Sequence, residues 1–277
     1  MVEKIVNALV PTGFGLNCDN ETDYSLIKAG ANSQKRHLNE IFDKPELIHD
    51  YHILVLGGGF SWADDHGAGH ILGKRTKRKL GDHLYRFIDD GKLILGICNG
   101  SQAGASMGIV PGFDEDYQAE KVAFTYNDCG NFINQWVGLK VNPDTNCVFT
   151  KGIDYIEFTI RHGEGKFYAD EGTLNRIVSQ NQVVLQYCKT DTKELANGEY
   201  PANPNGSLED IAGICDETGR ILMMMPHPEA YNHFTNYPTW TRDKHFLEKE
   251  GKQIESREGQ GVQIFRNAVE YIKENLL

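Results

Sequence analysis

Cys98 stands in a short stretch with the layout of a nucleophile elbow. An apolar run ends in the G-x-C-x-G sequence of residues 96–100, and small residues follow it. Between a strand and a helix, such a frame displays its central side chain on a sharp bend that only flanking glycines leave room for. The N-terminus of the following helix favours the thiolate through its dipole and free N–H groups. The motif therefore predicts a cysteine nucleophile.

A cysteine nucleophile needs a base, and the best candidate is His227, which follows an apolar run at residues 221–225. Glu229 lies two residues further on, and the prolines on either side of His227 favour an extended backbone, so both side chains can point to the same side. A carboxylate behind an imidazole fixes its tautomer and supports the imidazolium. Cys98, His227 and Glu229 thus form a predicted catalytic triad.

The alternative for Cys98 alone is a small buried hydrophobic residue, which is the usual role of a lone cysteine after an apolar strand. The glycine frame and the Pro-His-Pro-Glu sequence of residues 226–229 together favour the catalytic interpretation.

The two motifs resemble those of the class I glutamine amidotransferase domain, whose Cys, His and Glu hydrolyse glutamine and release ammonia. Further segments resemble the glutaminase subunits of phosphoribosylformylglycinamidine synthase, which act in purine synthesis. The similarity runs from near residue 4 to the C-terminal helix. The segments that carry it are residues 17–21, 58–65, 161–168 and 203–207.

This resemblance implies an α/β flavodoxin-like fold and a chain that needs no cofactor or metal of its own. It also implies that the ammonia passes to a separate large synthetase subunit that uses ATP and magnesium, with a small accessory subunit as a further possible partner. Glutamine would be the substrate of this chain. Nothing in the sequence predicts ATP binding, because the glycine-rich turn at residues 57–59 lacks the lysine of a P-loop.

Acyl transfer needs N–H donors aimed at the developing oxyanion. The family pattern and this chemistry together suggest Gly58, Gly59 and Asn99 as those donors. The resemblance further suggests substrate contacts from Gln102, His162 and Glu164. For His162 and Glu164 an ordinary β-hairpin turn is the alternative, since glycines flank the loop.

Composition restricts the function classes. The formal charge of −11 argues against a nucleic-acid partner. The basic run at residues 74–79 is interpreted as the solvated face of a helix, with a protein-docking patch as the alternative. No apolar stretch is long enough to span a membrane, and none resembles a signal peptide, so a cytoplasmic protein is expected. The six cysteines form no C-x-x-C pair, which favours a reducing compartment and mostly structural thiols.

A metal site is not expected. His66 and His70 are four residues apart and could share a metal ion on a helix, but two intervening glycines weaken such a helix and no third ligand is evident. Surface histidines are the favoured interpretation.

The order of elements predicts one domain over residues 1–277 with a mostly parallel central sheet flanked by helices. Helices are expected over residues 22–41, 70–90 and 261–277, and early strands at 4–10, 51–56 and 92–97. Additional β-rich segments are expected at residues 121–126, 136–141, 155–161, 182–188, 210–215 and 220–225. The role of residues 231–260 stays open between core aromatic packing and a partner surface.

Two rival functions remain at this point. The first is a class I amidotransferase of another pathway, such as GMP or anthranilate synthesis, which residues 161–168 and 203–207 argue against. The second is a non-catalytic binding or regulatory protein that keeps the same fold. A related cysteine hydrolase of the same architecture would instead cleave peptides.

Overall fold

The computed structural model describes residues 4–251 and 258–277. The strands are β1 Asn7–Thr12, β2 Asn32–His37, β3 Ile53–Leu56, β4 Leu93–Ile97, β5 Val122–Thr125, β6 Ile133–Val141, β7 Tyr155–His162, β8 Lys166–Ala169, β9 Val183–Cys188, β10 Ile211–Cys215 and β11 Ile221–Met224. The helices are α1 Asp19–Lys28, α2 Leu38–Asp43, α3 His70–Leu80, α4 Asp82–Asp89, α5 Asn99–Met107, α6 Glu171–Ser179, α7 Trp240–Lys249 and α8 Val262–Asn275.

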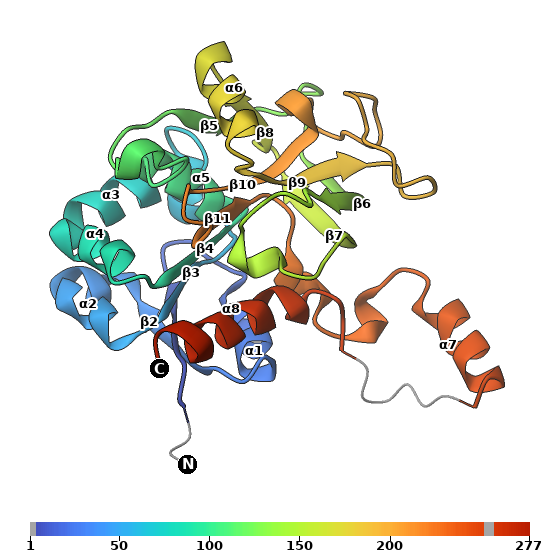
Figure 1. The fold of residues 1–277 in the computed structure, drawn as a ribbon, viewed down its shortest axis with the longest axis horizontal. Helices are drawn as coiled ribbons and strands as arrows, with labels where there is room; N and C mark the ends of the chain where they lie inside the picture. The colour runs from blue at the N-terminus through green and yellow to red at the C-terminus, as the bar shows by residue number, and fades with distance from the viewer. Residues whose placement is uncertain (1–3, 252–257) are drawn as a thin grey trace.

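Within the described residues, one nine-stranded sheet has the order β2-β1-β3-β4-β11-β10-β9-β6-β7. The first five strands run parallel, as in flavodoxin-like sheets, and the last four join them antiparallel. Strands β5 and β8 form a separate antiparallel pair. Figure 1 shows the helices on both sides of this sheet, with α1 and α8 packed together. The expected α/β fold, a central sheet flanked by helices with β-rich additions, is confirmed.

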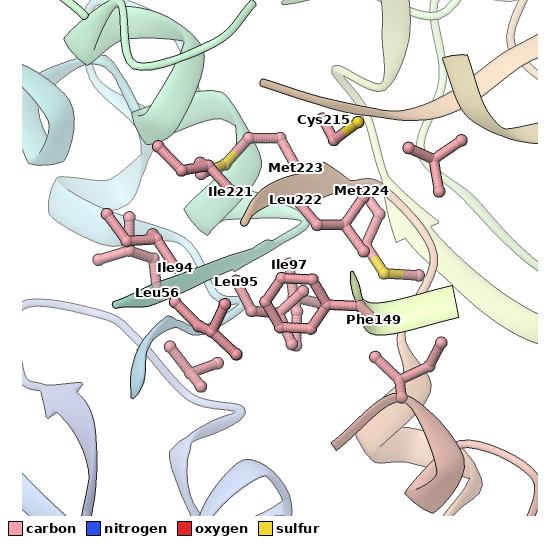
Figure 2. Close-up of a cluster of buried hydrophobic side chains, with 14 of the residues drawn as sticks. Leu56, Ile94, Leu95, Ile97, Phe149, Cys215, Ile221, Leu222, Met223 and Met224 are labelled. Carbon is pink, nitrogen blue, oxygen red and sulfur yellow. The ribbon is translucent and has the colours of Figure 1, made fainter. Parts of the chain in front are cut away.

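The middle of the sheet is buried on both faces, which explains the continuous apolar runs of β3, β4 and β11. Figure 2 shows the core around β4 and β11: Leu95, Ile97 and Phe149 lie on one side of these strands, and the side chain of Met223 lies on the other. Met223 packs so closely against Gly96 and Gly104 that a Cβ atom at either position would collide with its sulfur. This packing fixes the strand that leads to Cys98.

Two expected helices differ in the structure. The helix predicted over residues 22–41 is wrong in its second half, because residues 32–37 form β2, paired in parallel with β1. This edge strand is polar and largely exposed, so it lacks the apolar pattern that marks a buried strand. The helix predicted over residues 70–90 is divided into α3 and α4 at Gly81, whose φ of 50° is left-handed.

Of the described residues between 231 and 251, some pack against the body of the protein and others are exposed. Tyr231 and Tyr237 pack edge-on against Trp136, which places these aromatic rings in the body of the protein. Helix α7 has no buried residue and extends away from the body, as Figure 1 shows. Residues 252–257, which complete the open segment, lie outside the described residues.

Candidate active site

Cys98 lies at the predicted sharp bend, between β4 and the first residue of α5. Its φ of 51° is in the left-handed region, an unusual value for a residue with a side chain. A Cβ atom at Gly100 would collide with the carbonyl oxygen of Leu56, so the glycine is required for α5 to approach the sheet. The hydroxyl of Ser101 lies 2.8 Å from Gly96 O and 2.6 Å from Met224 O, which ties this helix start to β4 and β11.

His227 and Glu229 follow β11, which lies beside β4 with Met224 opposite Ile97. Because the two strands are parallel, Cys98 and His227 come to the same edge of the sheet. The backbone N–H of His227 donates to Thr159 O at 2.9 Å and holds this segment against β7. Nδ1 of His227 lies 2.5 Å from Oε1 of Glu229, and the side chains are only 2 % and 1 % exposed.

The electrostatics of His227 favour its charged form. Burial alone would lower its pKa, but the carboxylate of Glu229 and the sulfur atoms of Cys98 and Cys18 outweigh burial and raise the pKa well above the usual value. An ionised Glu229 accepts a hydrogen bond from Nδ1–H, so Nε2 is the nitrogen left for proton transfer. Nε2 is buried and has no hydrogen-bond partner among the described residues.

Cys18 is a second thiol beside His227, which the sequence analysis did not single out. It immediately precedes α1 and is partly buried. Burial raises the pKa of the Cys18 thiol, although a contact with His227 acts in the opposite direction. Cys98 has the strained bend and the tight glycine frame that Cys18 lacks, so Cys98 keeps the assignment as the candidate nucleophile.

The glycine turn that follows β3 lies against the same histidine. A Cβ atom at Gly58 would lie 2.8 Å from Cε1 of His227, and one at Gly59, where φ is 154°, would lie 2.6 Å from Gly15 O. Asn99 is buried at the start of α5, and its side-chain amide accepts from the N–H of Ser61 at 3.3 Å. Asn99 is therefore next to the candidate nucleophile and Gly58 lies against its base, and the role of all three predicted oxyanion donors stays a prediction.

The predicted substrate residues also gather at this place. Nε2 of Gln102, on the first turn of α5, donates to Glu164 O at 2.5 Å. The thiol of Cys98 lies 3.6 Å from Arg161 O, in the strand that leads to His162. The hairpin alternative for this loop is wrong, because β7 and β8 belong to different sheets and do not pair.

Hydrogen bonds around Asn127 define the tautomer of His162. The side-chain N–H₂ of Asn127 donates to the backbone oxygens of His162 and Asn131, so its Oδ1 accepts, from Gly165 N and from Nδ1 of His162. Burial, followed by the charge of His227, lowers the pKa of His162 to about 3. The ring is therefore neutral, and its unprotonated Nε2 has no partner among the described residues.

The carboxylates of Asp64, Asp65 and Glu164 line an adjoining cavity of about 820 Å³. Oδ1 of Asp64 accepts from the side-chain amide of Asn99 at 3.1 Å, and Oε2 of Glu164 accepts from Ala68 N at 3.1 Å. Burial, followed by the charge of Glu164, raises the pKa of Asp64 to about 6. Asp64 was part of a recognised segment in the sequence but was not predicted as a site residue.

The other sequence candidates lie outside this site. His66 and His70 are exposed and have different partners, Asp65 and Ser106, as expected for surface histidines. In the basic run of α3, Lys74 pairs with Glu120, and Lys77 donates to Gln118 O at 2.7 Å. These contacts within the chain favour the solvated-helix interpretation. No helix among the described residues is long and apolar enough to cross a membrane.

Comparison with known proteins agrees with this geometry. The family model of a CobB/CobQ-like glutamine amidotransferase domain matches residues 5–272. Phosphoribosylformylglycinamidine synthase subunit PurQ of Methanococcus maripaludis is 41% identical over 274 residues, which are 99% of this chain and 100% of that protein. This chain belongs to the PurQ family of glutamine amidotransferases. The PurQ subunit of Dehalococcoides mccartyi is also 41% identical, over 97% of this chain and 98% of its own length.

A solved structure of PurLQS from Thermotoga maritima contains a chain similar to this one. It has a TM-score of 0.67 and 26% sequence identity, and the match covers 97% of this chain and 100% of that chain. The similarity to the PurQ family therefore extends from sequence to fold.

Proposed function

We propose that this chain hydrolyses glutamine through Cys98, His227 and Glu229 and supplies the ammonia to a synthetase that makes phosphoribosylformylglycinamidine. The observation that carries the proposal is the meeting of the Cys98 elbow with the buried His227–Glu229 pair at one edge of the sheet. Membership of the PurQ family supports the choice of pathway.

The reaction begins when the Cys98 thiol gives its proton to His227 and the thiolate attacks the side-chain amide carbon of glutamine. Backbone N–H groups of Gly58, Gly59 and Asn99 stabilise the tetrahedral oxyanion. His227, as the imidazolium, protonates the leaving ammonia and leaves a glutamyl thioester on Cys98. Neutral His227 then activates water, which hydrolyses the thioester and releases glutamate. Glu229 holds Nδ1–H throughout, so Nε2 is the atom that accepts or donates the proton in each step.

Asp64 and Glu164 fit the α-ammonium group of glutamine. The two carboxylates line one cavity, and Asp64 is bonded to Asn99, the residue next to the nucleophile. Their mutual repulsion is relieved when a cation lies between them. Gln102 positions the Glu164 loop, and the free Nε2 of neutral His162 can accept a hydrogen bond from a substrate N–H group.

This model of substrate binding predicts a pH effect. Asp64 is charged above a pKa of about 6 and neutral below it. The KM for glutamine should therefore rise as the pH falls through 6, because the site loses one negative charge facing the ammonium. Asp64→Asn should raise KM about tenfold at pH 7.5, the size expected for a lost charged hydrogen bond.

Steady-state kinetics from pH 5 to pH 8 would test the effect, with Asp43→Asn as the control because Asp43 is an exposed aspartate outside the lining of this cavity. An Asp64→Asn variant with the KM and the pH profile of the wild type would refute this role.

The chain itself needs no cofactor for this chemistry, and we propose that the partner synthetase subunit uses ATP and magnesium. A small accessory subunit is a further expected partner, in keeping with the similarity to PurLQS. We propose that residues 1–277 act as one amidotransferase domain, because parallel and antiparallel strands share one sheet. A thiol nucleophile works best in a reducing compartment, which favours the cytoplasm.

The test of this function is glutamate release from glutamine by the purified chain, alone and with the large synthetase subunit, formylglycinamide ribonucleotide and ATP. We expect slow release by the isolated chain and strong stimulation by the complete mixture, because gated sites avoid wasting ammonia. Glutamate release that the synthetase subunit does not change would indicate that the protein serves another pathway. No release in either mixture would favour the non-catalytic binding protein.

A further inference from the structure

Cys18, His227 and Glu229 form a cluster of three different potential metal ligands. The Cys18 sulfur, one ring nitrogen of His227 and one carboxylate oxygen of Glu229 all lie within 4.8 Å of one another. Gly58 makes this meeting possible, since a Cβ atom there would lie 3.2 Å from the Cys18 sulfur and 2.8 Å from the His227 ring. The residues come from two distant parts of the chain.

Two of the three side chains have unused bonding capacity. Nε2 of His227 and Oε2 of Glu229 are buried and have no hydrogen-bond partner among the described residues. Both side chains are almost wholly buried, so water cannot readily form hydrogen bonds with these two atoms. The thiol of Cys18 lies 3.5 Å from Oδ1 of Asn17 and also contacts His227. The cluster therefore offers a thiol sulfur and a carboxylate oxygen that its present hydrogen bonds do not saturate, beside the imidazole Nδ1, which now bonds to Oε1 of Glu229.

We propose that Cys18, His227 and Glu229 bind a divalent zinc ion that inhibits the glutaminase. Thiolate, imidazole and carboxylate are the donors that Zn²⁺ uses, at distances of about 2.0–2.3 Å in tetrahedral geometry. Such a geometry places neighbouring donor atoms roughly 3.5 Å apart, so small side-chain rotations suffice to close the cluster. Magnesium and calcium fit poorly, because they prefer six or more oxygen ligands.

Zinc at this position removes His227 from catalysis. An ion shared with Glu229 must bind Nδ1, the ring nitrogen that faces the carboxylate, and it replaces the hydrogen bond that Nδ1–H donates to Oε1. The neutral imidazole then carries its proton on Nε2, which can no longer act as the base. The ligands bind as a thiolate and a neutral imidazole, so the protons of the Cys18 thiol and of the imidazolium pass to solvent. The inhibitory effect rests on the proposed function, whereas the binding site does not.

Direct metal binding tests the site without reference to activity. Cobalt(II) is the probe, because a thiolate ligand gives it a charge-transfer band, and zinc competition then gives the zinc affinity. We expect a single site in the wild-type chain and a loss of affinity in Cys18→Ser of at least about 10–100-fold, the loss that even outer-shell changes cause. Cys129→Ser is the matched control, because Cys129 is an exposed thiol.

Cys98→Ala separates this site from simple capture of zinc by the nucleophile. All three proposed ligands remain in this variant, so it should still bind the metal and keep a cobalt–thiolate band. Binding that disappears in Cys98→Ala but persists unchanged in Cys18→Ser would overturn the proposal. Circular dichroism of each variant checks that the fold is intact.

Zinc inhibition provides the second measurement, made on the complete mixture with each variant normalised to its own zinc-free rate. Wild type and Cys129→Ser should lose glutaminase activity and regain it with a chelator, while Cys18→Ser keeps its activity at the same zinc concentration. Equal zinc sensitivity of Cys18→Ser and wild type would refute the inhibition. Metal binding through Cys18 in a chain without glutaminase activity would support the site and disprove the proposed function.

Discussion

Cys98→Ala should reduce glutamine hydrolysis by at least about 10,000-fold, because it removes the thiol that forms the thioester. Alanine keeps the Cβ atom, so the strained bend and the contact of Gly100 with Leu56 are unchanged. Glutamate release in the complete mixture measures the loss, and a thermal unfolding curve close to that of the wild type confirms that the fold is retained.

Cys18→Ala is the matched control for the nucleophile, because it removes the other thiol beside His227. It should retain far more turnover than Cys98→Ala. If Cys98→Ala hydrolyses glutamine at the wild-type rate, Cys98 is not the nucleophile. If Cys18→Ala is instead the variant that loses glutamine hydrolysis, Cys18 is the nucleophile and the assignment of the two thiols is reversed.

Glu229→Gln should lower kcat/KM by roughly 10,000-fold, as expected when a triad loses the carboxylate that orients its histidine. Oε1 of Glu229 lies 2.5 Å from Nδ1 of His227. The side-chain amide introduced by the substitution can place an N–H₂ group there instead, which would move the proton of the neutral His227 ring from Nδ1 to Nε2. The pKa of His227 should also fall, since the carboxylate that outweighs its burial is gone.

Proton NMR of the His227 ring gives the pKa, and steady-state kinetics give the rate. Glu164→Gln is the control carboxylate, and it should raise KM more than it lowers kcat, because Glu164 is proposed to bind substrate. A loss of less than tenfold in Glu229→Gln, with an unchanged His227 pKa, would contradict the triad.

Much of the fold follows from local sequence patterns. The strands after residue 120 have clear apolar runs, and β6, β7, β9, β10 and β11 lie within a few residues of their predicted ranges. Strand β2 was missed because the edge of a sheet does not require apolar residues, and its partner β1 supplies the pairing. The short β8 was also missed, since it pairs with the distant β5. Long-range pairing is what local patterns cannot reveal.

The candidate site likewise contains residues that local sequence predicts and residues that it does not. Cys98 was predictable because its strained bend imposes glycines nearby in sequence, and His227 and Glu229 because two residues separate them. The positions of Cys18 and Asp64 depend on how α1 and the loop after β3 fold back against α5 and β11. The tautomer of His162 depends on Asn127, 35 residues away. No spacing rule expresses these contacts.

The central claim, that Cys98 is the residue that reacts with glutamine, is tested most directly by covalent labelling. The chain is incubated with an electrophilic glutamine analogue, digested, and the modified residue is located by mass spectrometry. We predict one label per chain, on Cys98, with protection by excess glutamine and concurrent loss of glutaminase activity. Labelling on Cys18 or on the exposed Cys129, with Cys98 unmodified and activity lost, would contradict the account.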